Sequence, residues 1–442
     1  MNGGVTLQLG RLTLAAAVLL AAAAVSTPAP AQSGRVIPTP TPTPTPEAPP
    51  PPKVEEPKFV PDPDAEKYRL VFTTRYQGGF SYRSSDEWAL ARRSAFDNFA
   101  EHLNRAGAQG YRLVTSLKGD PAVVALDGGQ FEYAWTETAS RAAHLKPGFA
   151  GTYSQLAKKG FRLAAHALLY GYCDPFNGRC DYRDFFLFER RKGFESPRER
   201  ASVDTERGAP RVKGQSDQDA LTAAVRAKLA EGLYPAHFLS KFEILLERES
   251  PEPALAEAGT EVRVVQSSSF WERDELPKKV NELGRQGFRL ALAGYEIAVM
   301  YRRPREAAQF SYVWLKSSKK EFEKELARLQ EAGAVFRTTY PDSDGTRRSL
   351  VFEQGPPGVA ARREYRVVRF EIQTRGDADG QAMLADLAPD SAGAQGELNR
   401  LAAEGFVVLA LFDADGFKFT RPGRGREGLI SEEFGVLLGR KR

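Results

Sequence analysis

The chain has 442 residues, of which 42% are hydrophobic and 10% are aromatic, and its formal net charge is +5. This composition is ample for packed cores, and the length predicts two or three domains. The charge argues against nucleic-acid binding, because it is weak and concentrated only at the terminal Arg440, Lys441 and Arg442.

The first 31 residues have the pattern of a signal peptide. They contain no acidic residue, one cation (Arg11) and an apolar run from Leu12 to Val25. That run is too short to span a bilayer comfortably, and Ala29 and Ala31 offer an A-x-A cleavage site. We therefore expect an exported bacterial protein, periplasmic or secreted, with no transmembrane span after cleavage. An uncleaved membrane anchor is the alternative.

Residues 32–66 are predicted to be a Pro-rich linker. Thr-Pro repeats begin near Pro38, and prolines fill positions 49–52. Such a composition favours extended polyproline II and cannot form a core. The segment is expected to be a spacer that keeps the folded part at a distance from whatever the N-terminus is attached to. The alternative is that it is a polyproline ligand for a partner.

One short phrase recurs through the remaining chain, most cleanly as VNELGRQGFRL (280–290) and LNRLAAEGFVV (398–408). Leu398 and Leu401 are spaced to share one face of a helix. Gly405 is then predicted to end that helix in the left-handed conformation. The alternating pattern after the glycine indicates a half-buried strand.

Six copies of the phrase are recognised by their glycines, and each is followed by a hairpin-like stretch. The weakest copy lies around Gly232, where Leu229 is one place out of register. Several hairpins turn on Asp-Gly, which is a strong short-range hairpin signal. The six structural repeat glycines are Gly110, Gly160, Gly232, Gly287, Gly333 and Gly405.

The predicted fold class is α+β, with tandem strand-helix-strand-strand units in which helices pack on one face of antiparallel sheets. One such unit is about the smallest that can bury a core alone, so neighbouring units are expected to pair. The expected divisions are units 1 and 2 in residues 67–192, a charged linker at 193–216, units 3 and 4 in 217–305, units 5 and 6 in 310–423, and a tail at 424–442.

The L-N-x-L-x-x-x-G-aromatic core resembles the small bacterial domain of unknown function 4177. Members of that family usually carry tryptophan after the glycine, where every copy here has another residue. The resemblance implies a fold for each unit and no chemistry, since the family lacks an assigned activity. The best matches are Leu398, Asn399, Leu401, Gly405 and Phe406, and Asn281, Leu283, Gly287 and Phe288.

Cys173 and Cys180 are the two cysteines of the chain. An oxidising compartment permits a disulfide, and the Asp-Pro and Asn-Gly turn signals between them bring the two residues back together. A metal site would need more ligands, and no histidine is near in sequence. We predict a disulfide, so the intact mass should fall short of the reduced mass by two hydrogens. Two free thiols in the exported protein would contradict it.

Other candidate chemistry is sparse, and no catalytic, cofactor-binding or metal-binding residue is nominated. Asp342, Asp344 and Glu353 occupy three positions of a calcium loop, but its glycine is misplaced and two arginines intervene, so a hairpin turn is expected. The histidines lie in separate units without ligand spacing. They are His102, His144, His166 and His237.

We therefore expect a non-catalytic envelope protein whose repeated modules bind other proteins or hold them apart. A binder of cell-wall glycan is the alternative, and an enzyme with a composite site between units is a third possibility. No cofactor is expected, and the sequence does not indicate an oligomeric state.

Overall fold

The structure is a computed structural model, and its described residues all belong to one compact unit, Glu56–Arg442. The predicted signal peptide lies outside the described residues, as does the predicted linker up to residue 64. The described residues are 65–72, 85–117, 121–139, 147–173, 180–194, 200–204, 216–240, 243–248, 252–267, 275–294, 296–304, 308–317, 321–341, 348–356, 363–375, 385–387, 391–420 and 429–441.

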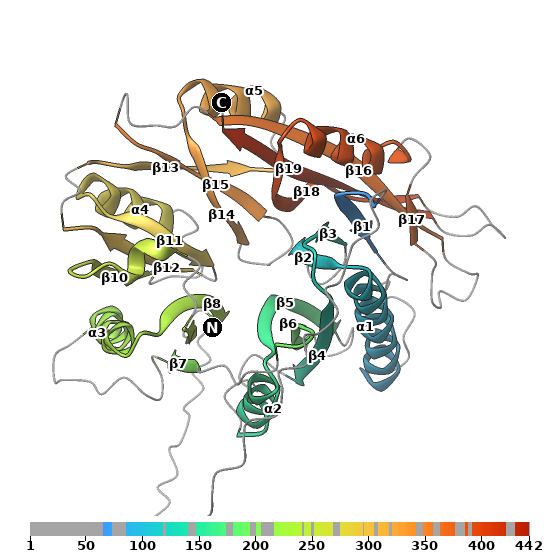
Figure 1. Cartoon of the computed structure of the whole chain (residues 1–442), viewed down its shortest axis with the longest axis horizontal. Coiled ribbons are helices and arrows are strands. Elements are labelled where there is room, and N and C mark those ends of the chain that lie inside the picture. The colour runs from blue at the N-terminus through green and yellow to red at the C-terminus, as the bar shows by residue number, and fades with distance from the viewer. Residues whose placement is uncertain are drawn as a thin grey trace, which may run out of the picture. The chain divides into compact units, whose positions relative to one another are not determined.

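Six strand-helix-strand-strand units follow one another along these residues, which confirms the predicted α+β class (Figure 1). Units 1 and 2 are β1 (Tyr68–Val71), α1 (Ser85–Ala108), β2 (Tyr111–Ser116), β3 (Ala122–Leu126), and β4 (Phe131–Ala139), α2 (Pro147–Lys158), β5 (Arg162–Cys173), β6 (Cys180–Arg191). Units 3 and 4 are β7 (Arg200–Asp204), α3 (Asp217–Ala230), β8 (Tyr234–Ser240), β9 (Glu243–Glu247), and, after the short 3-10 helix η2 (Pro253–Ala256), β10 (Glu261–Gln266), α4 (Glu275–Arg285), β11 (Arg289–Gly294), β12 (Ile297–Arg302). Units 5 and 6 are β13 (Ser311–Lys316), α5 (Phe322–Glu331), β14 (Val335–Pro341), β15 (Arg348–Gln354), and β16 (Arg363–Arg375), β17 (Ala385–Leu387), α6 (Ala394–Ala403), β18 (Val407–Thr420), β19 (Leu429–Lys441).

Every sheet places the last strand of its unit between the strand before the helix and the strand after it, antiparallel to both, and the sixth sheet adds the short β17 at its edge beside β16. The middle of each last strand is apolar, and its residues are buried on both faces. Val123, Val299 and Val351, for example, are fully buried. A central position suits such a strand, because both of its faces can be covered.

Two segments differ from the divisions expected from the sequence. The expected tail, 424–442, contains β19, which is the central strand of the sixth sheet and pairs with β16 from Arg363 to Arg375. The expected charged linker, 193–216, contains β7, the first strand of unit 3. β7 pairs with β9, about 40 positions away, and β19 pairs both with the preceding β18 and with the distant β16, so its central place is set by pairing across the sheet.

The helices end at the repeat glycines, whose φ angles are all positive, between 69° and 90°. At Gly405 the N–H of Phe406 donates to the carbonyl of Leu401 at 3.0 Å, which is the bond that closes a Schellman cap. Leu401 and Phe406 are both buried in the same hydrophobic cluster. The cap therefore turns the chain directly from the helix into the second strand.

Gly405→Ala should lower the free energy of unfolding by about 1 kcal/mol, because an L residue with a side chain is strained at positive φ. A Cβ at Gly405 would meet nothing within 4 Å, so the loss of stability would come from the positive φ angle alone. Denaturant unfolding would measure the change. An unchanged midpoint would contradict the left-handed cap.

The second strand of every unit carries a β-bulge at the fourth residue after its glycine. Each second strand is an edge of its sheet, and a bulge there twists the edge and blocks pairing with another strand. The bulged residues are Val114, Ala164, Ala236, Ala291, Arg337 and Leu409.

The hydrophobic cores lie between consecutive units, because each central strand serves two of them. Leu350 and Phe352 of β15 belong to the cluster that unit 5 shares with unit 6, whereas Val351 belongs to the cluster of unit 4. Similarly, Ile244 and Leu246 of β9 face the core with unit 4, and Leu245 packs with unit 2. These clusters join units both within the expected pairs and between them.

The same packing also joins the last unit to the first. Helix α6 contacts β1, as α1 contacts β4, α3 contacts β10, α4 contacts β13 and α5 contacts β16. Tyr68, Leu117 and Val123 of unit 1 share one buried cluster with Leu398 and Phe406 of unit 6. The six units thus form a closed circuit of contacts.

Glycine also allows one helix to approach the following unit closely. The carbonyl of Gly284 in α4 accepts a hydrogen bond from the N–H of Phe310 at 2.9 Å. A Cβ on Gly284 would lie 2.5 Å from the Phe310 carbonyl oxygen, and one on Gly107 would lie 2.3 Å from that of Phe131. These distances are too short for any real Cβ, so the contact requires glycine.

Gly284→Ala should therefore destabilise the protein by about 2 kcal/mol, because the new methyl group collides with backbone. Gly396 in α6 is the matched control, since a Cβ there would meet nothing within 4 Å. Gly396→Ala should be neutral or stabilising by about 0.5–1 kcal/mol, as expected for an unobstructed helix position. Denaturant unfolding of both variants would show opposite signs, and equal effects would contradict the close contact.

Candidate functional site

The asparagine of the repeated L-N motif bonds to the next unit. The side-chain amide of Asn281 donates to the carbonyl of Tyr312 at 3.1 Å, and its oxygen accepts from the N–H of Tyr312 at 2.7 Å. The hydroxyl of Tyr312 in turn accepts from the N–H of Leu290 at 2.8 Å. One asparagine and one tyrosine therefore fasten β13 of unit 5 to both α4 and β11 of unit 4.

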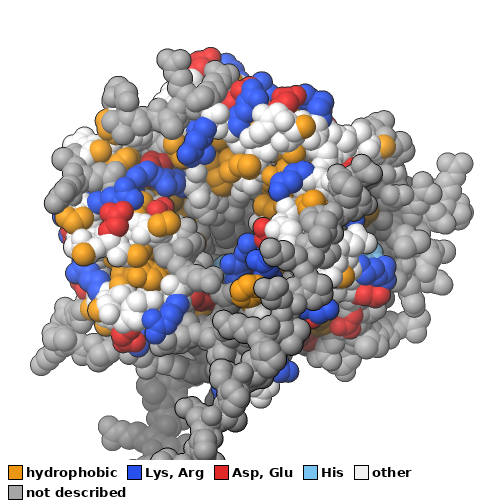
Figure 2. All heavy atoms as spheres, viewed as in Figure 1, with side chains coloured by type: hydrophobic (Ala, Val, Ile, Leu, Met, Phe, Trp, Pro, Cys, Tyr) orange, Lys and Arg blue, Asp and Glu red, His pale blue; other side chains and the backbone are white. Residues whose placement is uncertain are grey.

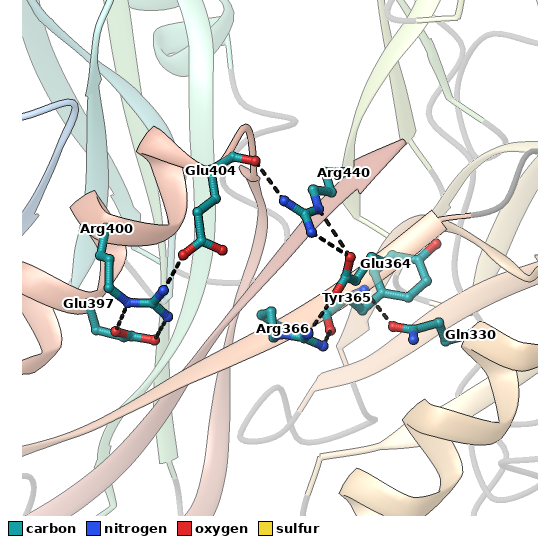
Figure 3. A network of polar contacts seen from close by, with 8 residues as sticks. All are labelled: Gln330, Glu364, Tyr365, Arg366, Glu397, Arg400, Glu404 and Arg440. Atoms are coloured by element: carbon teal, nitrogen blue, oxygen red, sulfur yellow. Dashed lines mark hydrogen bonds and ion pairs between the residues drawn. The ribbon is translucent and has the colours of Figure 1, made fainter. Parts of the chain in front are cut away.

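This joint is repeated at other interfaces. Asn104 holds the backbone of Tyr133 in the same two-bond manner, and Asn399 holds that of Tyr68. Between units 5 and 6 a glutamine takes the role: Gln330 accepts from the N–H of Tyr365 at 2.7 Å (Figure 3). The side-chain amide supplies the hydrogen bonds that a neighbouring strand would otherwise give to this sheet edge.

A buried glutamate with two arginines forms a second kind of joint. Glu353 has a side chain only 3% exposed and binds Arg289 of unit 4 at 2.7 Å and Arg337 of its own unit at 2.5 Å. The Tyr312 hydroxyl donates to its other oxygen at 3.0 Å. Glu353 is thus bound to arginines, while Asp342 and Asp344 of the calcium-loop pattern lie outside the described residues.

Glu189 makes the equivalent joint between units 1 and 2. Its Oε1 accepts from Nε of Arg112 at 2.9 Å and from Nε of Arg162 at 2.8 Å. The Nη1 of Arg112 also lies 3.6 Å from Asp127. Each of these arginines stands two residues after a cap glycine, as Arg289 does.

Burial governs the titration of these joints. It raises the pKa of Tyr133 and of Tyr312, and the neighbouring Glu189 or Glu353 carboxylate raises it further, so both hydroxyls stay protonated. Burial also raises the pKa of Glu353, which Arg289 and the Tyr312 hydroxyl lower only part of the way back. Burial is the largest effect on Arg112 and lowers its pKa, but attraction and hydrogen bonding to Glu189, together with the Asp127 carboxylate, raise that pKa above its ordinary value.

A further polar network ties the end of α6 to the sixth sheet (Figure 3). Arg440 of β19 donates to Glu364 at 2.9 Å and to the backbone carbonyl of Glu404 at 2.9 Å. A cation there complements the carbonyl end of the helix. Arg366 also binds Glu364, and Arg400 binds Glu397 and Glu404 along the helix.

The Glu189 joint borders a cavity of about 640 Å³. Its walls come from strands of units 1, 2, 3 and 6, chiefly β2, β5, β8 and the start of β18, with Glu189 of β6 and Glu247 of β9; they include Arg112, Arg162, His237 and Val407. Figure 2 shows one face of the molecule, hollowed near its centre, with hydrophobic and Lys or Arg side chains at the margin of the hollow. This cavity is the candidate functional site.

The residues singled out from the sequence are spread over the units. Cys173 and Cys180 are backbone register partners at the end of the β5–β6 pair, while the disulfide itself stays a prediction. His166 stacks on Phe186 with ring centroids 4.5 Å apart, and His144 lies outside the described residues. In the described part of the chain, no three His, Cys, Asp or Glu residues are grouped as a metal ion would require.

Sequence reasoning missed the buried glutamates and their arginine partners, of which Glu189, Arg112 and Arg162 border the cavity. A signal was present, because Arg follows the cap glycine by two places at Arg112, Arg162 and Arg289. Glu also closes an apolar run within its strand, after Phe188 at Glu189 and after Phe352 at Glu353. A buried strand that ends in a charge predicts a paired charge.

Comparison with protein-family models, with curated proteins and with solved structures gave no match. None of the helices in the described part of the chain has both the length and the apolar character that crossing a membrane requires.

Proposed function

We propose that this protein is an exported, non-catalytic envelope scaffold, which holds six small modules in a fixed arrangement and presents their outer surfaces to protein partners. The observation that carries the proposal is the recurrent joint between units, which also links unit 6 to unit 1. Asn399 and Tyr68 make the same bonds there as Asn281 and Tyr312 make between neighbouring units.

The buried polar side chains support this proposal, because they bind neighbouring units to one another. Glu189 and Glu353 each bind arginines from two units, and the amides of Asn104, Asn281 and Asn399 bind backbone of the following unit. Such groups hold the modules together, and repetition of a module multiplies surface more readily than it builds a reactive centre.

Export is tested by expressing the full chain with a C-terminal epitope and fractionating the cells. The expected result is a periplasmic or secreted protein whose N-terminus is Gln32. A cytoplasmic protein that retains residues 1–31 would contradict the proposal.

The partner class is tested by co-sedimentation of the mature protein with purified bacterial sacculi at moderate salt, where weak charge attraction is screened. We expect no saturable pelleting, and we expect cross-linking in the envelope to recover a defined protein. Saturable pelleting would overturn the protein partner in favour of cell-wall glycan.

A further inference from the structure

The cavity has the size of a small-molecule site, and its lining mixes polar and apolar residues. Its volume of about 640 Å³ falls within the roughly 300–1,000 Å³ typical of such sites. The bulged residues Val114, Ala164 and Ala236 all line it, and a bulge typically re-aims a side chain away from the sheet. The bulges also block strand addition, so a ligand would meet side chains there.

Two arginines are held with part of their surface open to this cavity. Arg112 and Arg162 are 35% and 29% exposed, whereas Glu189, which both of them bind, is 3% exposed. Arg162 uses Nε and Nη2 for Glu189, and among the described residues we find no partner for its Nη1. A guanidinium fixed in this way is prepared for a second carboxylate, because its orientation is already set.

Excess positive charge is confined to the two arginines, because the charges of the whole lining balance: Lys67, Arg112 and Arg162 stand against Asp127, Glu189 and Glu247. Near Glu189 two guanidiniums face one buried carboxylate, which leaves one positive charge, and Asp127 offsets it only partly because that side chain is 48% exposed. The other charged or titratable groups of the lining are Lys67, whose Nζ donates to the carbonyl of Leu126 at 2.8 Å, and Tyr68, whose hydroxyl accepts from the N–H of Val408 at 3.2 Å, together with Glu247 and His237. A dianion would meet repulsion from the Asp127 and Glu247 carboxylates.

The lining also provides apolar surface. Val114 is 41% exposed and Val407 is 51% exposed, and both are among the large hydrophobic residues that stand out as exposed in the described chain. Exposed apolar side chains beside fixed charges are typical of binding sites, where apolar contact supplies affinity and polar groups fix the orientation.

We propose that this cavity binds a small organic monoanion, consisting of a carboxylate joined to an apolar group. The carboxylate lies against Arg162 and Arg112, and the apolar group lies against Val114 and Val407. Such a ligand can be an acyl chain or the C-terminal residues of a short peptide, which share this chemistry. Binding of this kind goes beyond the scaffold function and does not depend on export.

Isothermal titration of the mature protein with hexanoate and with hexanamide tests the charge requirement. A parallel pair, the tripeptide Ala-Ala-Val and its C-terminal amide, distinguishes the peptide source from the acyl source. We expect one or both carboxylates to bind saturably and the corresponding amide to bind at least about tenfold more weakly. Equal binding of acid and amide, or binding by neither acid, would overturn the proposal.

Arg162→Gln should weaken binding of the carboxylate by about tenfold. Arg289→Gln is the matched control, because Arg289 also follows a cap glycine by two places and pairs with Glu353, but it does not line this cavity. Binding by the control should be unchanged, and an equal loss in both variants would overturn the assignment. Val407→Asp provides a second test in case Arg162→Gln does not fold. Val407 is half-exposed, so its substitution should leave the fold intact, and the new carboxylate should abolish binding of the anion. Full affinity in Val407→Asp would contradict the assignment of the site.

Discussion

Glu353→Ala should lower the free energy of unfolding by about 3–5 kcal/mol, the cost typical of removing one partner from a buried ion pair. The side chains of Arg289 and Arg337 are only 21% and 16% exposed, and both point at the Glu353 carboxylate. Without it, two cations remain close together and poorly hydrated, with the carboxylate of Glu252 lying 3.6 Å from Arg337. The Tyr312 hydroxyl also loses its carboxylate acceptor.

The matched control is Glu397→Ala. Glu397 binds Arg400 on the surface of α6, where the two side chains are 43% and 56% exposed. An exposed pair within one helix contributes little, because water screens it and both side chains give up rotamer freedom. Denaturant unfolding should therefore show a large loss for Glu353→Ala and almost none for Glu397→Ala. Similar small losses in both would contradict the joint between units 4 and 5.

Asn399→Ala should lower the free energy of unfolding by about 2–3 kcal/mol, because the N–H of Tyr68 loses its acceptor in a partly buried position. The Asn399 oxygen accepts from that N–H at 2.9 Å, and its amide donates to the Tyr68 carbonyl at 3.1 Å. Substitution should also open the contact between units 6 and 1. Amide hydrogen exchange along β1 should then become faster, since that interface joins residues that are not adjacent in the chain.

Asn281→Ala provides the comparison, because Asn281 makes equivalent bonds with Tyr312. Units 4 and 5 are connected by the short segment 303–310, so β13 cannot move far from α4 even when the asparagine is lost. We expect a similar loss of stability but a smaller increase of exchange in β13 than Asn399→Ala produces in β1. An equal increase of amide exchange in both variants would contradict the inference that unit 6 is held to unit 1 by this non-covalent contact alone.

Much of the unit was predictable from sequence, because its signals are local. A helical spacing of leucines, a glycine at the helix end and an alternating strand all lie within about eleven residues, and these features depend on short-range geometry. The α+β class follows from them. The site was less predictable: Glu189 and Arg112 are 77 positions apart, and a spacing of this kind has no local pattern.

The sequence by itself therefore determined the repeated unit, its order of elements and the places where its helices end. Only the tertiary structure decided what each face meets. It assigned the asparagine of the L-N motif to the next unit, made 429–441 a central strand by pairing it with β16, and joined Tyr68 to Asn399 across 331 positions. The physical reason is that a strand buried on both faces needs a cover for each, and its own helix supplies only one. The second cover comes from a neighbouring unit, and for the first unit that neighbour is the last.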